Sequence, residues 1–140
     1  MHKGSCLCSA VRYELTGQLG PMIFCHCPDC RKAQGGAFAA VAPVAAVDFH
    51  LLAGSELLTE YESLPGKKQV FCGRCGTPVY SRRDADPAKL RLRLGPLDTP
   101  VNAAPVAHIW VGSKAPWEEI CGLAPQYEKF ERARKPGTSG

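Results

Sequence analysis

The sequence predicts a single, mainly β domain. Segments such as residues 11–15 alternate apolar and polar side chains with a period of two, whereas the longer period of helices is sparse. Glycine and proline supply 14 and 12 of the 140 residues and are spread along the chain, which indicates many turns between short strands. Because this length suits one hydrophobic core, we expect one compact domain of small antiparallel sheets over residues 1–131 and a flexible tail over residues 132–140.

The expected strands follow one another with turn residues between them. The clearest alternation occupies residues 11–15, 47–51 and 90–94. Short apolar segments bounded by turn residues indicate further strands at residues 38–41, 57–61, 69–71, 79–81 and 107–111. One short helix is expected from Pro28 to Lys32, because proline is tolerated in the first helical turn and Gly35-Gly36 can end the helix.

Composition and charge narrow the class of protein. Apolar residues make up 45% and charged residues 21% of the chain, as in ordinary globular proteins. The longest apolar stretch, residues 37–47, is interrupted by Pro43 and falls short of the ~18 residues that a membrane helix needs. The first residues lack the apolar core of a signal peptide, so we expect a cytoplasmic protein that does not associate with membranes.

The net charge of +4 does not by itself indicate a nucleic-acid partner. We expect the basic residues to form a solvated face, which is the usual place for lysine and arginine, and the alternative is a phosphate-binding patch. The residues concerned are Arg82, Arg83, Lys89, Arg91, Arg93, Lys129, Arg132, Arg134 and Lys135.

The eight cysteines carry the strongest chemical signal. Seven of them fall into three close sets: Cys6-x-Cys8, Cys25-x-Cys27-x-x-Cys30 and Cys72-x-x-Cys75. Disulfides explain these sets poorly, because residues two apart are badly placed for an S–S bond and the expected compartment is reducing. Zinc explains them better, because its thiolate sites are built from closely spaced cysteine pairs that the fold brings together.

The pair Cys72 and Cys75 predicts a structural zinc site. Each cysteine is followed by glycine, as is typical of a zinc knuckle, where glycine permits the tight turn. A knuckle supplies two ligands, and Cys6 and Cys8 can supply two more, because residues i and i+2 of an extended chain point to the same side. Four thiolates make a closed tetrahedral site that clamps the N-terminus to the middle of the chain and contributes directly to folding.

The remaining set, Cys25, Cys27 and Cys30, predicts a second zinc site of a different kind. Three protein ligands with an open fourth position are what a catalytic zinc site requires. Cys30 also lies in the first turn of the expected helix, where the helix dipole favours a thiolate. Two other interpretations stay open. One is a metal-free cluster of redox-active thiols, and the other is a structural site completed by His50, His108 or Cys121.

A series of motifs resembles one protein family in order along the chain. They occupy residues 4–8, 11–14, 25–32 (CHCPDCRK), 35–38, 71–77 (FCGRCGT), 97–98, 108–111 and 113–117. With them the sequence resembles the family of glutathione-dependent formaldehyde-activating enzymes and the related centromere protein V domain. The resemblance runs through residues 4–130 and includes all seven clustered cysteines. One departure is Ser9, where the family often has glycine.

The resemblance implies a compact β fold held by zinc, similar to that of small Rab-GTPase accessory proteins. It implies two zinc ions per chain: a structural ion held by Cys6, Cys8, Cys72 and Cys75, and a catalytic ion held by Cys25, Cys27 and Cys30. The implied reaction joins formaldehyde to the thiol of glutathione and gives S-hydroxymethylglutathione, which is carbon–sulfur lyase chemistry. Since three thiolates weaken zinc as a Lewis acid, thiol capture suits such a site better than activation of water.

Five further residues are candidate substrate contacts. Arg31 or Lys32 can stabilise the developing alkoxide or hold a glutathione carboxylate. Phe38 can either form a wall of the open zinc site or be a buried residue of a strand. His108 and Trp110 share one face of a β-like segment and can either line the substrate pocket or belong to the aromatic core.

A second hypothesis is a zinc-stabilised binding module for a protein or a nucleic acid, without catalysis. It draws on the accessory-protein resemblance and on the basic strand at residues 89–93. That strand lacks the interleaved aromatic residues that single-strand binders use, which disfavours nucleic acid. The sequence carries no signal for the oligomeric state.

Overall fold

The computed structural model describes residues 1–131, which form two β-sheets and one α-helix. The smaller sheet has three antiparallel strands in the order β1 (His2–Ser5), β2 (Arg12–Leu15) and β5 (Phe49–Ala53). Short 3-10 helices lie at Ala46–Asp48, Ser55–Leu57 and Val111–Ser113. The expected tail at residues 132–140 lies outside the described residues.

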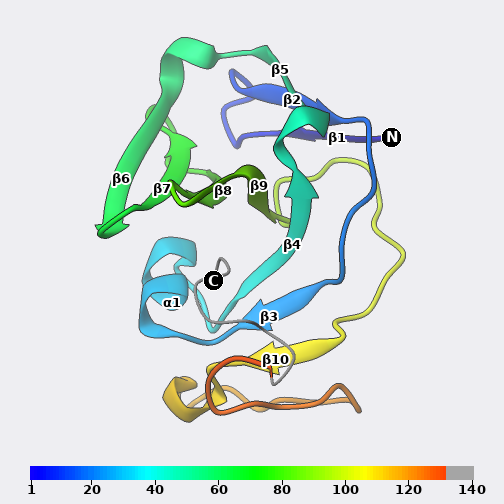
Figure 1. Ribbon diagram of the computed structural model, residues 1–140, viewed down its shortest axis with the longest axis vertical. Helices are drawn as coiled ribbons and strands as arrows, with labels where there is room; N and C mark the ends of the chain where they lie inside the picture. The colour runs from blue at the N-terminus through cyan, green and yellow to red at the C-terminus, as the bar shows by residue number, and fades with distance from the viewer. Residues whose placement is uncertain (132–140) are drawn as a thin grey trace.

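The larger sheet has seven strands and contains one parallel pair at its edge. β10 (Ala107–Ile109) runs parallel to β3 (Ile23–Cys25). The order continues through antiparallel neighbours: β4 (Ala39–Ala45), β9 (Asp86–Arg93), β8 (Pro78–Arg83), β7 (Lys67–Cys72) and β6 (Leu58–Leu64). The sheet curves, so that α1 (Pro28–Gln34) lies between β3 and the β6–β7 pair (Figure 1). The predicted mainly β fold is confirmed.

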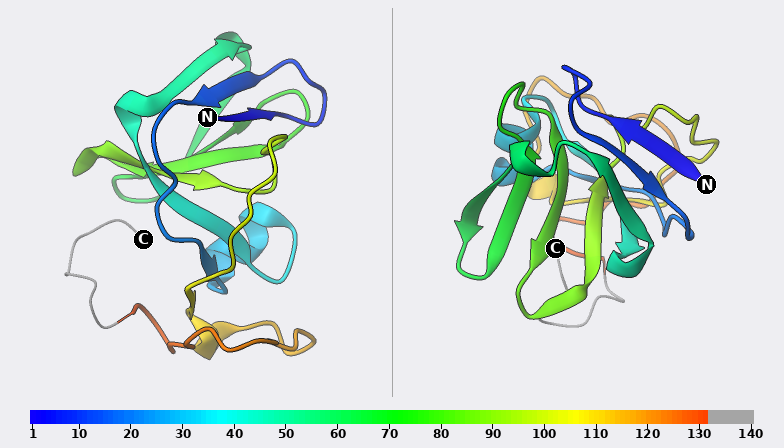
Figure 2. Two further views of the ribbon diagram at one scale, coloured as in Figure 1. Left: turned by 90° about the vertical axis from the view of Figure 1, so that its right-hand side faces the viewer. Right: turned by 90° about the horizontal axis from the view of Figure 1, so that it is seen from above.

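The two faces of the larger sheet are covered by different partners. One face packs against the smaller sheet, and Leu90 and Leu92 of β9 meet Tyr13 and Leu15 of β2 in the first hydrophobic core. Figure 2 shows the smaller sheet stacked on this side. The other face carries a second core around β10, β3 and β4, to which Cys30 of α1 belongs. Each of the two cysteine groups described below adjoins one of these cores.

The prediction of a solvated basic strand is wrong for Arg91 and Arg93. Their side chains are 5% and 2% exposed, because β9 lies between β4 and β8 and both of its faces are covered. The alternation in the sequence marked two faces correctly. It could not show that the arginine face turns toward the second core, where Arg93 pairs in register with buried Val41.

The helix forms where the sequence predicts it and extends two residues further. Pro28 occupies its first turn, and the N-cap residue Cys27 accepts a hydrogen bond at Sγ from the backbone N–H of Cys30 over 3.3 Å. Gly35 ends the helix in the left-handed region with φ of 68°, a conformation that glycine adopts at little cost.

The predicted strands are present with shifted ends. The segment at residues 47–51 begins as a 3-10 helix, and its strand starts only at Phe49. The segment at residues 38–41 lies in β4, which starts one residue later and runs on to Ala45. In the described part of the chain, no helix has the length and apolar character needed to cross a membrane.

Candidate metal centre

The first cysteine group joins the loop after β1 to the end of β7 and the loop that follows it. The sulfur atoms of Cys6, Cys8, Cys72 and Cys75 all lie within 4.8 Å of one another. The Sγ atoms of Cys6 and Cys8 are 3.5 Å apart, and those of Cys8 and Cys72 are 3.9 Å apart. A tetrahedron with zinc–sulfur bonds of about 2.3 Å has edges of about 3.8 Å, so this donor set fits a tetrahedral zinc ion.

Local hydrogen bonds shape this first group. Gly76 has φ of 80°, and its N–H bonds the carbonyl of Cys72 over 2.7 Å, which closes the expected knuckle turn. The hydroxyl group of Thr77 contacts Cys75 Sγ at 3.2 Å and accepts the N–H of Leu7 at 2.9 Å, thereby linking the two loops. The hydroxyl contact lowers the pKa of Cys75 to about 5, which favours the thiolate that a metal requires.

The second group is Cys25, Cys27 and Cys30, whose sulfur atoms also lie within 4.8 Å of one another. Cys25 ends β3, while Cys27 and Cys30 lie at the start of α1, so the three donors come from one short segment. No fourth histidine, cysteine or carboxylate in residues 1–131 completes the group. It therefore has the composition of a site with one open position.

Thiol chemistry shows that this second group suits a cation. Contacts from the thiols of Cys25 and Cys30 lower the pKa of Cys27 to about 2, and the same contact with Cys27 raises the pKa of Cys25. Three thiols in mutual contact therefore resist losing all three protons, because like charges would meet. A divalent cation between them removes that obstacle, and thiolate sulfur is a favoured ligand of zinc.

A buried histidine pair supports the chain between the ligands. His26 is fully buried, and its Nε2 lies 3.1 Å from Nδ1 of His108. Burial, followed by the effect of His108 and then Lys114, lowers the pKa of His26 to about 4. Both rings are then neutral near pH 7, so one nitrogen can donate to the other. The backbone N–H of His26 also bonds Ile109, which fixes Cys25 and Cys27 on either side of the pair.

A cavity of about 200 Å³ opens at the second cysteine group. Cys25 and Cys27 line it together with Lys67 of β7 and Arg83 of β8. The other lining residues are mostly apolar or aromatic: Pro28, Asp29, Leu64, Ile109, Trp110 and Phe130. Two of the three cysteines thus share one small space with two cationic residues, whereas the four-cysteine group does not line this cavity.

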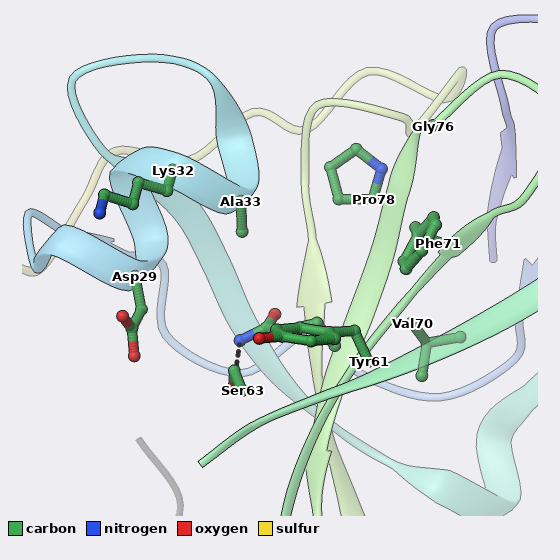
Figure 3. A pocket seen from close by; sticks show the side chains of 10 residues that line it. Asp29, Lys32, Ala33, Tyr61, Ser63, Val70, Phe71, Gly76 and Pro78 are labelled. Carbon is green, nitrogen blue, oxygen red and sulfur yellow. Dashed lines mark hydrogen bonds between the residues drawn. The ribbon is translucent and has the colours of Figure 1, made fainter.

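A larger cavity of about 630 Å³ lies between α1 and the strands β6, β7 and β8. Figure 3 shows Asp29, Lys32 and Ala33 on the helix side and Tyr61 across from them. The amide of Gln69 donates a hydrogen bond to the hydroxyl group of Ser63 over 3.4 Å at its base. Asp29 lines both cavities, so the larger cavity adjoins the one that holds the thiols.

The five candidate substrate contacts lie in different parts of the structure. Trp110 lines the smaller cavity and Lys32 the larger one. Arg31 lines neither. Phe38 stacks on Phe24 with ring centroids 4.3 Å apart and also contacts His26. His108 is buried against His26, which matches the interpretation as core better than the interpretation as pocket lining.

The proposed alternative ligands lie elsewhere. His50 is exposed and contacts the hydroxyl group of Thr16 at 3.2 Å, and Cys121 is exposed and belongs to neither cysteine group. Sequence reasoning also missed Lys67, because nothing local distinguishes it from its neighbour Lys68. Lys67 is buried and Lys68 is partly buried, but only the folded sheet shows which lysine turns inward.

Comparisons with known proteins agree with this architecture. A crystal structure of a protein from Rhodobacter sphaeroides superposes with a TM-score of 0.59 at 28% sequence identity, covering 71% of this chain and 91% of that chain. The family described as glutathione-dependent formaldehyde-activating enzyme matches residues 1–113, which include both cysteine groups. On that match, the chain belongs to the family of glutathione-dependent formaldehyde-activating enzymes.

Proposed function

We propose that this protein catalyses the addition of glutathione to formaldehyde at the cavity beside Cys25, Cys27 and Cys30. In this reaction the thiol sulfur bonds to the carbonyl carbon, the C=O π electrons move to oxygen, and the thiol hydrogen ends on that oxygen. The product is S-hydroxymethylglutathione, and no oxidant is required. The observation that carries the proposal is a three-thiol group of which Cys25 and Cys27 line a cavity, in a chain that also contains a separate four-thiol group.

The two cysteine groups have different roles in this proposal, one structural and one catalytic. Cys6, Cys8, Cys72 and Cys75 hold a structural zinc ion, and Cys25, Cys27 and Cys30 hold the catalytic one. A zinc ion held by Cys25, Cys27 and Cys30 would favour the thiolate form of a substrate thiol near neutral pH. Trp110, Leu64 and Phe130 line the cavity beside Cys25 and Cys27 and give it apolar walls.

The two adjoining cavities accommodate a substrate larger than formaldehyde. The smaller cavity, about 200 Å³, is below the roughly 300–1,000 Å³ that usually enclose a small organic ligand. It therefore suits the reacting end of a tripeptide thiol. The larger cavity, about 630 Å³, has room for the rest, and its walls offer the polar groups of Lys32, Ser63 and Gln69.

The alternative of a non-catalytic binding module loses one of its supports. It drew on an exposed basic strand at residues 89–93, but Arg91 and Arg93 of that strand are buried. The cationic side chains at the smaller cavity face a space that suits a small molecule rather than a macromolecular surface. The enzyme is therefore the function that the geometry supports best.

Exchange NMR spectroscopy tests the proposal. Glutathione and formaldehyde combine reversibly without a catalyst, so the rate of exchange between free glutathione and its hydroxymethyl adduct is compared with and without protein. We expect exchange to quicken in proportion to the concentration of zinc-replete protein. Cys27→Ser should remove the acceleration, and Cys121→Ser, outside both cysteine groups, should keep it. Unchanged exchange with zinc-replete wild-type protein would refute the proposal.

A further inference from the structure

Two cations stand opposite each other at the smaller cavity. Lys67 of β7 and Arg83 of β8 are in register on neighbouring antiparallel strands, so they share one face of the sheet. Like charges placed directly opposite each other in this way destabilise a sheet. The same face carries Arg91 and Arg93 on β9, which are buried. The face that turns toward the cavity and α1 is therefore rich in positive charge.

Among the described residues, no carboxylate forms an ion pair with Lys67. Its side chain is only 7% exposed, and no hydrogen bond or ion pair joins its amine to another side chain within residues 1–131. Burial, opposed by Cys30 and reinforced by the neighbouring arginines, lowers the pKa of Lys67. The Nε atom of Arg83 is likewise buried without an acceptor. Buried cations are normally paired, so the pair calls for an anion.

The neighbouring residue Lys68, unlike Lys67, has carboxylate partners. Lys68 is the next residue of the same strand and points to the other side, where its amine bonds Glu62 at 2.9 Å and Asp84 at 3.0 Å. Two carboxylates of the chain thus neutralise Lys68. Lys67 instead lines the smaller cavity, where no carboxylate of the described residues forms an ion pair with it.

We propose that Lys67 and Arg83 bind a carboxylate of the substrate, so that the cavity selects thiols that carry a carboxylate group. The inference rests on the proposed function, because it takes the cavity beside Cys25 and Cys27 as the place of the thiol. A carboxylate accepts charge-assisted hydrogen bonds from ammonium and guanidinium groups, and arginine can offer it two parallel N–H donors. It would also relieve the repulsion between the two cations.

This assignment replaces the earlier candidates for carboxylate binding. Lys32 lines the larger cavity only, and Arg31 lines neither of the two. Lys67 and Arg83 are the lysine and arginine side chains that share the smaller cavity with the sulfur atoms. The competing role for Lys67 and Arg83 is to balance the charge of the three thiolates themselves, without contact to the substrate.

Binding measurements without formaldehyde test the inference. The full-length, zinc-replete protein is titrated by calorimetry with glutathione and with glutathione dimethyl ester, which keeps the thiol but lacks both carboxylate charges. We expect wild-type protein to bind glutathione about 10- to 100-fold more tightly than the ester, the range of charge-assisted hydrogen bonds. Lys67→Met should bring this ratio close to one. Lys67→Arg should restore much of it, which a merely structural role would not do.

Matched controls keep the inference open to refutation. Lys68→Met removes the same charge one residue away on the other side of β7, and it should leave the ratio unchanged. Arg83→Gln, at a less buried position, should lower the ratio even if Lys67→Met folds poorly. Equal binding of both thiols by wild-type protein overturns the inference. It is also overturned if Lys67→Met lowers zinc content while keeping the ratio, because the lysine then serves the thiolates.

The result is distinguishable from failure of the proposed function. If wild-type protein accelerates exchange between glutathione and formaldehyde but Lys67→Met keeps the wild-type ratio, the reaction stands and the role of Lys67 is refuted. If the ratio changes as expected but no acceleration is found, carboxylate recognition stands and the proposed reaction is refuted.

Discussion

Replacing one cysteine in each group should have very different consequences for folding. Cys72→Ser removes a donor that is fully buried in the first core, and Cys27→Ser removes a half-buried donor next to the smaller cavity. We expect the first variant to lose its folded state and the second to stay folded with one zinc ion fewer. The reason lies in what each group ties together.

The magnitude follows from the length of chain that each group closes. Cys8 and Cys72 are 64 residues apart, and the loop-entropy relation for cross-links gives about 4 kcal/mol for a loop of that size. The same relation gives about 2 kcal/mol for the short segment from Cys25 to Cys30. Structural zinc sites contribute about 10–16 kcal/mol in small zinc-dependent peptides, which matches or exceeds the ~5–15 kcal/mol stability of a typical domain.

The segment around Cys27 is also held in place by interactions that do not involve a metal. β3 is hydrogen-bonded to β4 and β10, and the pair of His26 and His108 joins it to β10 from within the core. Loss of the second group should therefore change the cavity without unfolding the sheet.

The assay combines metal analysis with thermal unfolding followed by circular dichroism. Wild-type protein should contain two zinc ions per chain and unfold in one cooperative transition. Cys27→Ser should retain one zinc ion and a cooperative transition. Cys72→Ser should already be unfolded at 25 °C and should therefore show no cooperative transition on heating. Cys121→Ser, whose thiol is exposed and outside both groups, is the matched control and should behave as wild type. If Cys27→Ser and Cys72→Ser unfold to the same extent, or if wild-type protein binds one zinc ion, the division into a closed and an open site is refuted.

Three stability measurements by urea denaturation test the packing and backbone geometry. Gly4→Ala places a Cβ atom 2.3 Å from the ring of buried Tyr13 and should cost about 1–3 kcal/mol, whereas Gly36→Ala meets no atom within 4 Å and should change little. Leu92→Ala removes a fully buried side chain from the first core and should cost about 2–5 kcal/mol; a loss below 1 kcal/mol would contradict the assignment of that core. Ser9→Gly should stabilise the protein by up to about 1 kcal/mol, because Ser9 has φ of 63°, and a destabilised variant would show that its side chain matters more than its backbone.

The local features of the sequence were sufficient for much of the fold. Proline at the start and glycine at the end define α1, because helix boundaries depend on residues within one turn. Period-two alternation and short apolar segments located eight of the ten strands in residues 1–131, because a strand exposes its two faces alternately, but β1 and β3 were missed. Their order in the sheet was not predictable, because β-pairing joins segments far apart in the chain. The parallel pairing of β10 with β3 is the clearest example.

The two sets of thiols could be identified from the chain alone, because ligand spacing is local and chemically specific, and the resemblance of these motifs identified the family. The charged residues that lie near them could be found only in the folded protein. No motif in the sequence distinguishes Lys67 or Arg83 as a site residue. Strand register nevertheless places them opposite each other at the cavity beside Cys27. Alternation shows that a side chain has a face, but whether that face meets water, a core or a cavity depends on the layers that pack over it.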